Sequence, residues 1–233
     1  MTTTDVACPL VGGSPHRRVA GVLVIAALAL LGARAAAAQP PPRLNRLFSP
    51  QELGVLEGPD RDLWQKPDQV MDALGIADGS HVADIGAGGG WFTVRLARRV
   101  GPNGLVFAED IQREMIDAIT RRMQRDGLTN IRPILGTPRD PMLPEGELDA
   151  VLIVDSYHEM TDPVALLQAS SRALRPKGRI GIVEFRTSGE GPAPPSAERV
   201  APEVVIRDAE GAGLRLLHRE DFLRFQYMLV FGR

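Results

Sequence analysis

A loop of closely spaced glycines is the part of this sequence best placed to bind a ligand. Residues 84–90 read Asp-Ile-Gly-Ala-Gly-Gly-Gly, between a short strand-like run and a helical pattern. Gly86, Gly88 and Gly90 carry no side chain, so a ligand can approach their backbone closely. The unpaired N–H groups of the following helix point at the same place. We therefore expect Asp84 and these glycines to form a nucleotide-binding turn.

The spacing differs from the dinucleotide fingerprint. G-x-G-x-x-G needs a small residue in its sixth place, where this chain has Trp91. A nicotinamide-dependent oxidoreductase is therefore a disfavoured alternative. The pattern Asp-x-Gly-x-Gly-x-Gly instead resembles motif I of the class I S-adenosylmethionine-dependent methyltransferases. The resemblance covers residues 60–233 and is strongest over 82–184. It implies S-adenosylmethionine as the cofactor, with its amino-acid part against the glycine loop.

A pair of carboxylates ends the next strand-like run, Leu105 to Asp110. A carboxylate at this point can accept hydrogen bonds from both hydroxyls of a ribose. The resemblance implies this role for Asp110, with Glu109 as the alternative. A second interpretation leaves either acid as a solvated strand end or a favourable charge at a helix N-terminus.

The loop 136–144 resembles the segment that passes beside the adenine in similar methyltransferases. Thr137 and Asp140 are the candidates for holding the polar edge of the ring. Ordinary turn chemistry of a proline-rich loop is the alternative explanation of both residues.

Candidate catalytic residues follow the fourth predicted strand, in the run Asp155-Ser156-Tyr157-His158-Glu159. Ligands of open α/β sheets bind beyond the carboxyl ends of the strands. Methyl transfer needs mainly the alignment of donor and acceptor, together with a base where the acceptor must lose a proton. His158 is the candidate general base, oriented by Asp155 or Glu159. The alternative makes His158 and Glu159 helix caps and Asp155 a cofactor contact.

The acceptor predicted from this run is a small molecule. Enzymes that methylate amino groups of nucleobases or glutamine commonly carry an Asn-Pro-Pro-Tyr-like tetrad here, and Asp-Ser-Tyr-His does not match it. An oxygen or carbon nucleophile is favoured. The chain has 27 Lys and Arg against 29 Asp and Glu, and this near balance argues against a nucleic-acid partner. The oligomeric state stays open.

Short apolar runs alternate with helical patterns from residue 81 onward, which is typical of a parallel sheet with crossover helices. We expect strands at 81–85, 104–109, 130–135, 149–154 and 178–184, and helices at 67–74, 91–99, 112–126, 162–175 and 201–212. The last two strand-like runs, 214–218 and 225–231, are too close for a crossover helix and predict an antiparallel hairpin. The predicted fold is α/β, a doubly wound, seven-stranded, mostly parallel sheet with an antiparallel C-terminal hairpin strand, as in class I methyltransferases.

The N-terminal residues 1–38 have the pattern of a signal peptide. Two arginines precede an apolar run from Val19 to Leu31, and small residues that suit cleavage follow. The run is shorter than the ~20 residues of a membrane-spanning helix. We expect export, to the periplasm after cleavage, or anchoring in the inner membrane if the segment is retained. An exported binding protein that keeps the fold without catalysis is a further alternative.

Residues 39–59 are predicted to form a linker and a short helix, with a capping box at Ser49 to Glu52, and residues 60–233 the methyltransferase domain. The single cysteine, Cys8, lies in the N-terminal segment. The domain is therefore expected to have neither a disulfide nor a thiolate metal cluster, and we predict no metal site.

Overall fold

The computed structural model describes Thr4, Ala7 and residues 47–233. The chain divides into two units, Met1–Pro42 and Arg43–Arg233, and every described helix and strand lies in the second. Apart from Thr4 and Ala7, the predicted signal peptide lies outside the described residues, as does the linker before residue 47. None of the helices over 47–233 combines the length and apolarity needed to cross a membrane.

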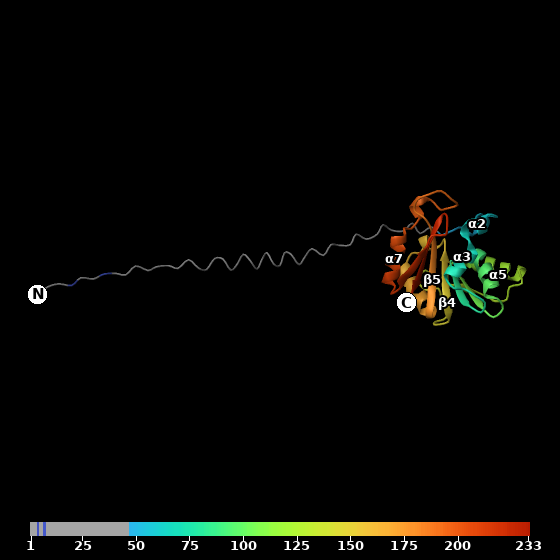
Figure 1. The fold of residues 1–233 in the computed structure, drawn as a ribbon, viewed down its shortest axis with the longest axis horizontal. Helices are drawn as coiled ribbons and strands as arrows, with labels where there is room; N and C mark the ends of the chain where they lie inside the picture. Colours follow the sequence, from blue (N-terminus) through green and yellow to red (C-terminus); the bar gives the residue numbers. More distant parts are fainter. Residues whose placement is uncertain (1–3, 5–6, 8–46) are drawn as a thin grey trace. The chain divides into compact units, whose positions relative to one another are not determined.

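The second unit is built on a seven-stranded sheet with the strand order β3-β2-β1-β4-β5-β7-β6. In chain order the strands are β1 (His81–Ile85), β2 (Leu105–Asp110), β3 (Ile131–Leu135), β4 (Leu148–Val154), β5 (Leu174–Phe185), β6 (Arg215–Glu220) and β7 (Gln226–Gly232). The first five strands pair in parallel, whereas β7 is antiparallel to both β5 and β6. β4 and β5 lie side by side at the centre of the domain (Figure 1). The predicted sheet and its terminal hairpin are confirmed.

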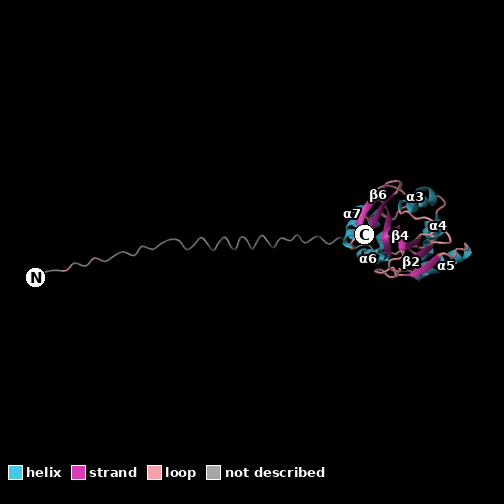
Figure 2. Ribbon diagram, turned by 60° about the horizontal axis from the view of Figure 1, so that its bottom comes forward, coloured by secondary structure: helices cyan, strands magenta, loops and turns pink. Residues whose placement is uncertain are grey.

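Helices cover both faces of this sheet (Figure 2). In chain order they are η1 (Pro50–Glu57), α2 (Arg61–Gln65), α3 (Pro67–Ala73), α4 (Trp91–Val100), α5 (Arg113–Arg125), η2 (Tyr157–Glu159), α6 (Pro163–Ala173), η3 (Ser196–Glu198) and α7 (Pro202–Gly211), where η marks a 3-10 helix. Buried residues of α3, α4 and α5 pack on one face, and those of α6 and α7 on the other. The domain is therefore doubly wound, as predicted.

The central strand β4 shows why the sequence forms this sandwich. Its residues Ala150 and Leu152 belong to the core on the α4 side, and Val151 and Ile153 to the core on the α6 side. Successive side chains of a strand point to opposite faces, so a strand covered on both faces reads as a continuous apolar run.

Two local expectations were wrong. The short helix predicted after Ser49 is present as a 3-10 helix, but Ser49 does not cap it, because its hydroxyl donates to Gln51 Oε1 at 2.6 Å. The helix predicted to reach residue 175 ends at Ala173, and β5 begins at once with Leu174 paired to Leu148. Pairing with the neighbouring strand overrides local helix propensity here.

Candidate active site

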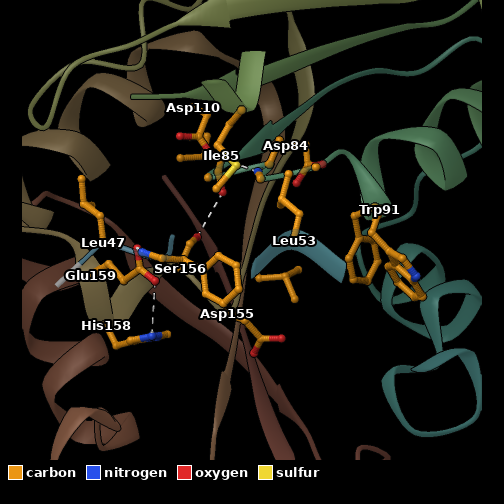
Figure 3. A pocket seen from close by; sticks show the side chains of 18 of the residues that line it. Leu47, Leu53, Asp84, Ile85, Trp91, Asp110, Asp155, Ser156, His158 and Glu159 are labelled. Atoms are coloured by element: carbon orange, nitrogen blue, oxygen red, sulfur yellow. Dashed lines mark hydrogen bonds and ion pairs between the residues drawn. The ribbon is translucent and has the colours of Figure 1, made fainter. Parts of the chain in front are cut away.

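A cavity of about 720 Å³ opens at the carboxyl ends of β1, β2 and β4. The strand register brings these ends together, because Ile85 pairs with Glu109 on one side and with Ile153 on the other. Figure 3 shows Asp84 and Asp110 at one end of the cavity and Asp155 and His158 at the other. The volume lies in the range of ~300–1,000 Å³ usual for small-molecule pockets.

The glycine loop forms the floor of one end. Gly86, Gly88 and Gly90 have φ angles of 66°, 55° and 82°, the left-handed region that favours glycine. The Gly88 N–H donates to Asp110 Oδ2 at 3.0 Å, and the Gly86 N–H donates to Glu109 Oε2 at 3.4 Å. Gly86 and Gly88 line the cavity, whereas Gly90 begins helix α4 outside its lining.

Asp84 is held inside the turn. The Thr93 hydroxyl donates to Asp84 Oδ2 at 2.6 Å, and the carboxyl group is almost fully buried while still lining the cavity. Burial raises the pKa of Asp84 to about 6. Since Thr93 lies in the first turn of α4, this hydrogen bond ties the end of β1 to the helix after the loop.

The two acids at the end of β2 have different surroundings. Asp110 accepts from the Gln112 N–H at 2.9 Å as well as from Gly88, and burial raises its pKa. Glu109 is buried beside Gly136, and burial raises its pKa to about 8. Within the described part of the chain, Glu109 Oε1 is buried without a hydrogen-bond partner. Both acids line the cavity and offer oxygens to hydroxyl or amino groups of a ligand.

Thr137 and Asp140 lie in one turn but differ in their relation to the cavity. Thr137 lines the cavity, but Asp140 does not. The Asp140 N–H donates to the Thr137 hydroxyl at 3.0 Å, and the Asp140 carboxylate lies 4.0 Å from Arg172. Asp140 thus stabilises the turn and forms an ion pair with Arg172. Its role at an adenine ring stays a prediction.

A ring of polar side chains holds Asp155, a non-glycine residue with a positive φ of 52°. Its carboxylate accepts from Gln226 Nε2 and lies 3.7 Å from the Arg61 guanidinium. Gln65 closes the ring, because it accepts from Arg61 Nε at 3.1 Å and donates to Gln226 Oε1 at 2.6 Å. Burial raises the pKa of Asp155 to about 7, although Arg61 opposes the shift. The ring joins α2, β7 and the end of β4 beneath the cavity.

Neither a place for Arg61 in the site nor its hydrogen bond to Gln65 was expected. Their separation of four residues on α2 is a local signal for a pair on one helix face. The link to Gln226 spans 161 residues and exists only in the folded sheet. Arg61 also stacks over Trp91, with its guanidinium carbon 4.2 Å from the ring centroid. Trp91, which excludes the dinucleotide fingerprint, therefore helps to fix α2 against α4.

Glu159, one of the two expected partners, lies 3.8 Å from His158 Nε2 as an ion pair, but the hydrogen bonds of the His158 ring go to Glu184 of β5. His158 Nδ1 lies 3.0 Å from Glu184 Oε2, and the Glu184 side chain is fully buried. Burial alone would lower the pKa of His158, but the hydrogen bond and negative charge of Glu184, aided by Glu159 and Asp155, raise it to about 9. At neutral pH the ring already holds the proton that a general base would have to accept.

A segment before α2 packs over the cavity. The Phe48 N–H donates to Glu159 Oε2 at 3.1 Å, and Gln112 Nε2 donates to the Phe48 carbonyl at 3.0 Å. Leu53 of η1 lies over the middle of the cavity (Figure 3). In the part of the chain that the structure describes, no group of His, Cys, Asp and Glu side chains is arranged to hold a metal ion.

Comparison with known proteins finds methyltransferases. A family model described as a methyltransferase domain matches residues 82–178. Nocamycin O-methyltransferase of Saccharothrix syringae is 33% identical over 131 residues, which are 56% of this chain and 44% of that protein. The ubiquinone/menaquinone biosynthesis C-methyltransferase UbiE of Pasteurella multocida is 29% identical over 117 residues, 50% of this chain and 44% of the relative. The chain spans less than half the length of these two relatives.

The fold comparison agrees. The crystal structure of a SAM-dependent methyltransferase from Aquifex aeolicus has a TM-score of 0.76 and 24% identity, covering 79% of this chain and 98% of that one. The sheet and the site therefore define a class I methyltransferase fold. Residues 82–178 thus resemble a methyltransferase domain, and S-adenosylmethionine is the cofactor that this resemblance and the fold imply.

The residues present suit this cofactor. The bare backbone at Gly86 and Gly88 leaves room for its amino-acid part, and the Asp110 carboxylate faces the cavity as an acceptor for ribose hydroxyls. Glu109 lines the same end of the cavity. These residues would hold the cofactor at the end of the cavity formed by β1 and β2.

The substitution Gly86→Ala should abolish binding of S-adenosylhomocysteine, the demethylated cofactor. An added Cβ would lie 2.5 Å from Ser156 Oγ, in addition to the strain of a positive φ. Gly127→Ala is the matched control, since Gly127 has the same φ of +66° and nothing within 4 Å of an added Cβ. Left-handed strain costs about 1–2 kcal/mol and should affect both variants. Titration calorimetry and chemical denaturation would compare them, and equal affinity in the two would contradict the site.

The substitution Glu109→Gln should flatten the pH dependence of stability. The folded pKa of about 8 lies above the ordinary value of 4.5, so the folded state binds this proton more tightly. Its contribution is fully present below the unfolded pKa and is lost as the pH rises through about 8. Between about pH 5 and about pH 8 the free energy of unfolding should therefore fall less in Glu109→Gln than in the wild type. Denaturant unfolding measures this, with Glu114→Gln, an exposed acid of α5, as the control; identical slopes would refute the shift.

Proposed function

We propose that this protein is a methyltransferase that transfers the methyl group of S-adenosylmethionine to an oxygen or carbon atom of a small molecule. One observation carries the proposal. A bare-backbone turn and the Asp110 carboxylate, joined by the Gly88 N–H, face a single cavity at the carboxyl ends of β1 and β2. This arrangement supports binding of a nucleoside at the point where α/β sheets of this kind bind ligands.

The cofactor supplies a methyl group that is already reactive, attached to a sulfonium. The chain's own task is to hold donor and acceptor in line and to keep water away. Asp110 and the glycine loop serve the donor end of the cavity. The opposite end has His158 and Asp155 beside the apolar side chains of Trp64 and Phe185, and it is left for the acceptor.

The names of the relatives support an oxygen or carbon acceptor. One matched relative is an O-methyltransferase and another a C-methyltransferase. The lining of the acceptor end is mainly apolar and holds no cluster of Lys or Arg among its described residues, which favours a small organic molecule over a nucleic acid.

An exported binding protein that does not catalyse is the second candidate, because the sequence predicts a signal in residues 1–38. We propose that the domain is exported, to the periplasm or as an inner-membrane anchored protein. A methyltransferase outside the cytoplasm must carry its cofactor along or obtain it there. Release of S-adenosylhomocysteine in the presence of an acceptor panel would separate the enzyme from the binding protein.

Calorimetry tests the cofactor assignment. The chain should bind S-adenosylmethionine and S-adenosylhomocysteine and ignore NAD, whereas an oxidoreductase would do the reverse. Asp110→Ala should weaken binding of S-adenosylhomocysteine by about 1–3 kcal/mol through lost charge-assisted hydrogen bonds. Asp117→Ala, an exposed acid of the neighbouring helix α5, should leave it unchanged. Equal affinities of the two variants would refute the role of Asp110.

A reporter fusion tests export. Residues 1–40 placed before an alkaline phosphatase that is active only outside the cytoplasm should give active enzyme. Replacing Leu28 and Leu30 with Arg should abolish this activity, because charge in the apolar run prevents insertion. An inactive fusion with the unchanged segment would remove the export proposal.

A further inference from the structure

Two side chains at the acceptor end of the cavity form an ion pair that is too long for a hydrogen bond. His158 Nε2 lies 3.8 Å from Glu159 Oε1, and both residues line the cavity (Figure 3). This separation exceeds the ~3.2 Å limit of a good hydrogen bond. A single oxygen atom placed between them can lie at ~2.8 Å from each. The pair therefore offers one donor and one acceptor to the same guest atom.

Each of the two groups is held from its other side. Glu184 binds His158 through Nδ1, at 3.0 Å, and so leaves Nε2 directed away from β5. The Phe48 N–H donates to Glu159 Oε2 at 3.1 Å and leaves Oε1 available. The side chains are only 10% and 17% exposed, so the space between them is shielded from bulk water. A pair with both members fixed from behind is preorganised for a ligand.

The charges of the pair differ in sign. The buried Glu184 keeps His158 as an imidazolium by raising its pKa to about 9. Burial raises the pKa of Glu159, which makes it a stronger base than an ordinary carboxylate, although the Phe48 N–H and His158 oppose the shift. Asp155 also faces this end, but its charge is offset by Arg61. A protonated imidazole beside a carboxylate of raised pKa is suited to acid and base roles.

We propose that His158 and Glu159 together bind the hydroxyl group of the methyl acceptor, with Glu159 as the base and His158 as the holder of the resulting anion. This inference rests on the proposed function. The acceptor's O–H bond breaks, its proton forms an O–H bond with Glu159 Oε1, and the electron pair stays on the acceptor oxygen. The imidazolium N–H at Nε2 stabilises that oxygen, which is then the nucleophile. His158 thus takes the opposite role to the general base expected from the sequence.

The same pair narrows the acceptor class. A carboxylate is a weak base, so it can deprotonate an acidic hydroxyl such as a phenol or enol far more readily than an aliphatic alcohol. The cavity into which the pair opens has apolar side chains in its lining, among them Trp64, Met160 and Phe185. The acceptor is therefore an apolar, flat or compact molecule that carries an acidic hydroxyl.

The test uses 4-nitrophenol as the probe, because its anion is yellow and its neutral form is not. The probe is titrated into the S-adenosylhomocysteine complex at a pH below the probe's own pKa, by absorbance and by calorimetry in two buffers of different ionisation enthalpy. The wild type should bind it as the coloured anion with almost no net proton release, because the proton moves to Glu159. 4-Nitroanisole, which has no hydroxyl, should bind more weakly.

Two variants separate the roles. His158→Gln keeps a neutral N–H donor and should bind the probe roughly ten- to hundredfold more weakly, without colour. Glu159→Gln should either bind the probe uncoloured or release about one proton per probe to the buffer, and both results show that Glu159 carries the proton. His218→Gln and Glu220→Gln are the controls. These residues form a second His–Glu pair, 3.3 Å apart, on the partly exposed strand β6.

The inference would be overturned if His158→Gln bound the probe with unchanged affinity and colour. It would also be overturned if Glu159→Gln bound the coloured anion with as little proton release as the wild type. If a variant does not fold, infrared difference spectra of the wild type still test the inference. Binding of the probe should produce the band of a protonated carboxyl group, and absence of this band would equally overturn the inference. If the wild type binds S-adenosylhomocysteine but not the probe, this inference alone fails. If it binds neither, the proposed function fails.

Discussion

The site depends on the hydrogen bonds that join the loop after β1 to the acids at the end of β2. A loop of three left-handed glycines has no side chains of its own to fix it, and Gly86 and Gly88 are held through their N–H groups by Glu109 and Asp110. Parallel pairing of β1 with β2 brings these partners into register. The bare backbone that admits a ligand is thus rigid only because the neighbouring strand supplies carboxylates at its tip.

These buried carboxylates are costly to the fold. Burial raises the pKa values of Asp84, Glu109 and Asp155 to about 6, 8 and 7, so the folded state resists charging them. Hydrogen bonds from Thr93 and Gln226 compensate two of them. Glu109 Oε1 has no such compensation in the described chain. Strain and uncompensated polarity gathered at one cavity are typical of a functional site, where stability is given up for binding.

The sequence predicts what is local or periodic. Apolar runs of strand length locate β1 to β5, and the short interval before residue 225 predicts the antiparallel hairpin, because each signal lies within a few residues. The alternation of strand-like runs and helical patterns also places the glycine loop after β1 and the two acids at the end of β2. The ring from Arg61 to Gln226 could not be predicted, since its members lie far apart in sequence and meet only across the folded sheet. The pairing of His158 with Glu184 was missed for the same reason, although Glu184 ends the predicted strand 178–184.

That missed contact changes the chemistry assigned to the site. If Asp155 or Glu159 were the only acid beside it, the histidine would be a reasonable base near neutral pH. With the fully buried Glu184 at Nδ1, removing the proton from His158 would leave a buried carboxylate without its counter-charge, which is costly in a low dielectric. The proton therefore stays on the ring. The neighbouring Glu159, whose pKa is raised, is the group that can accept a proton from the acceptor. A side chain from a strand beneath the cavity thus decides which of two adjacent residues can accept a proton.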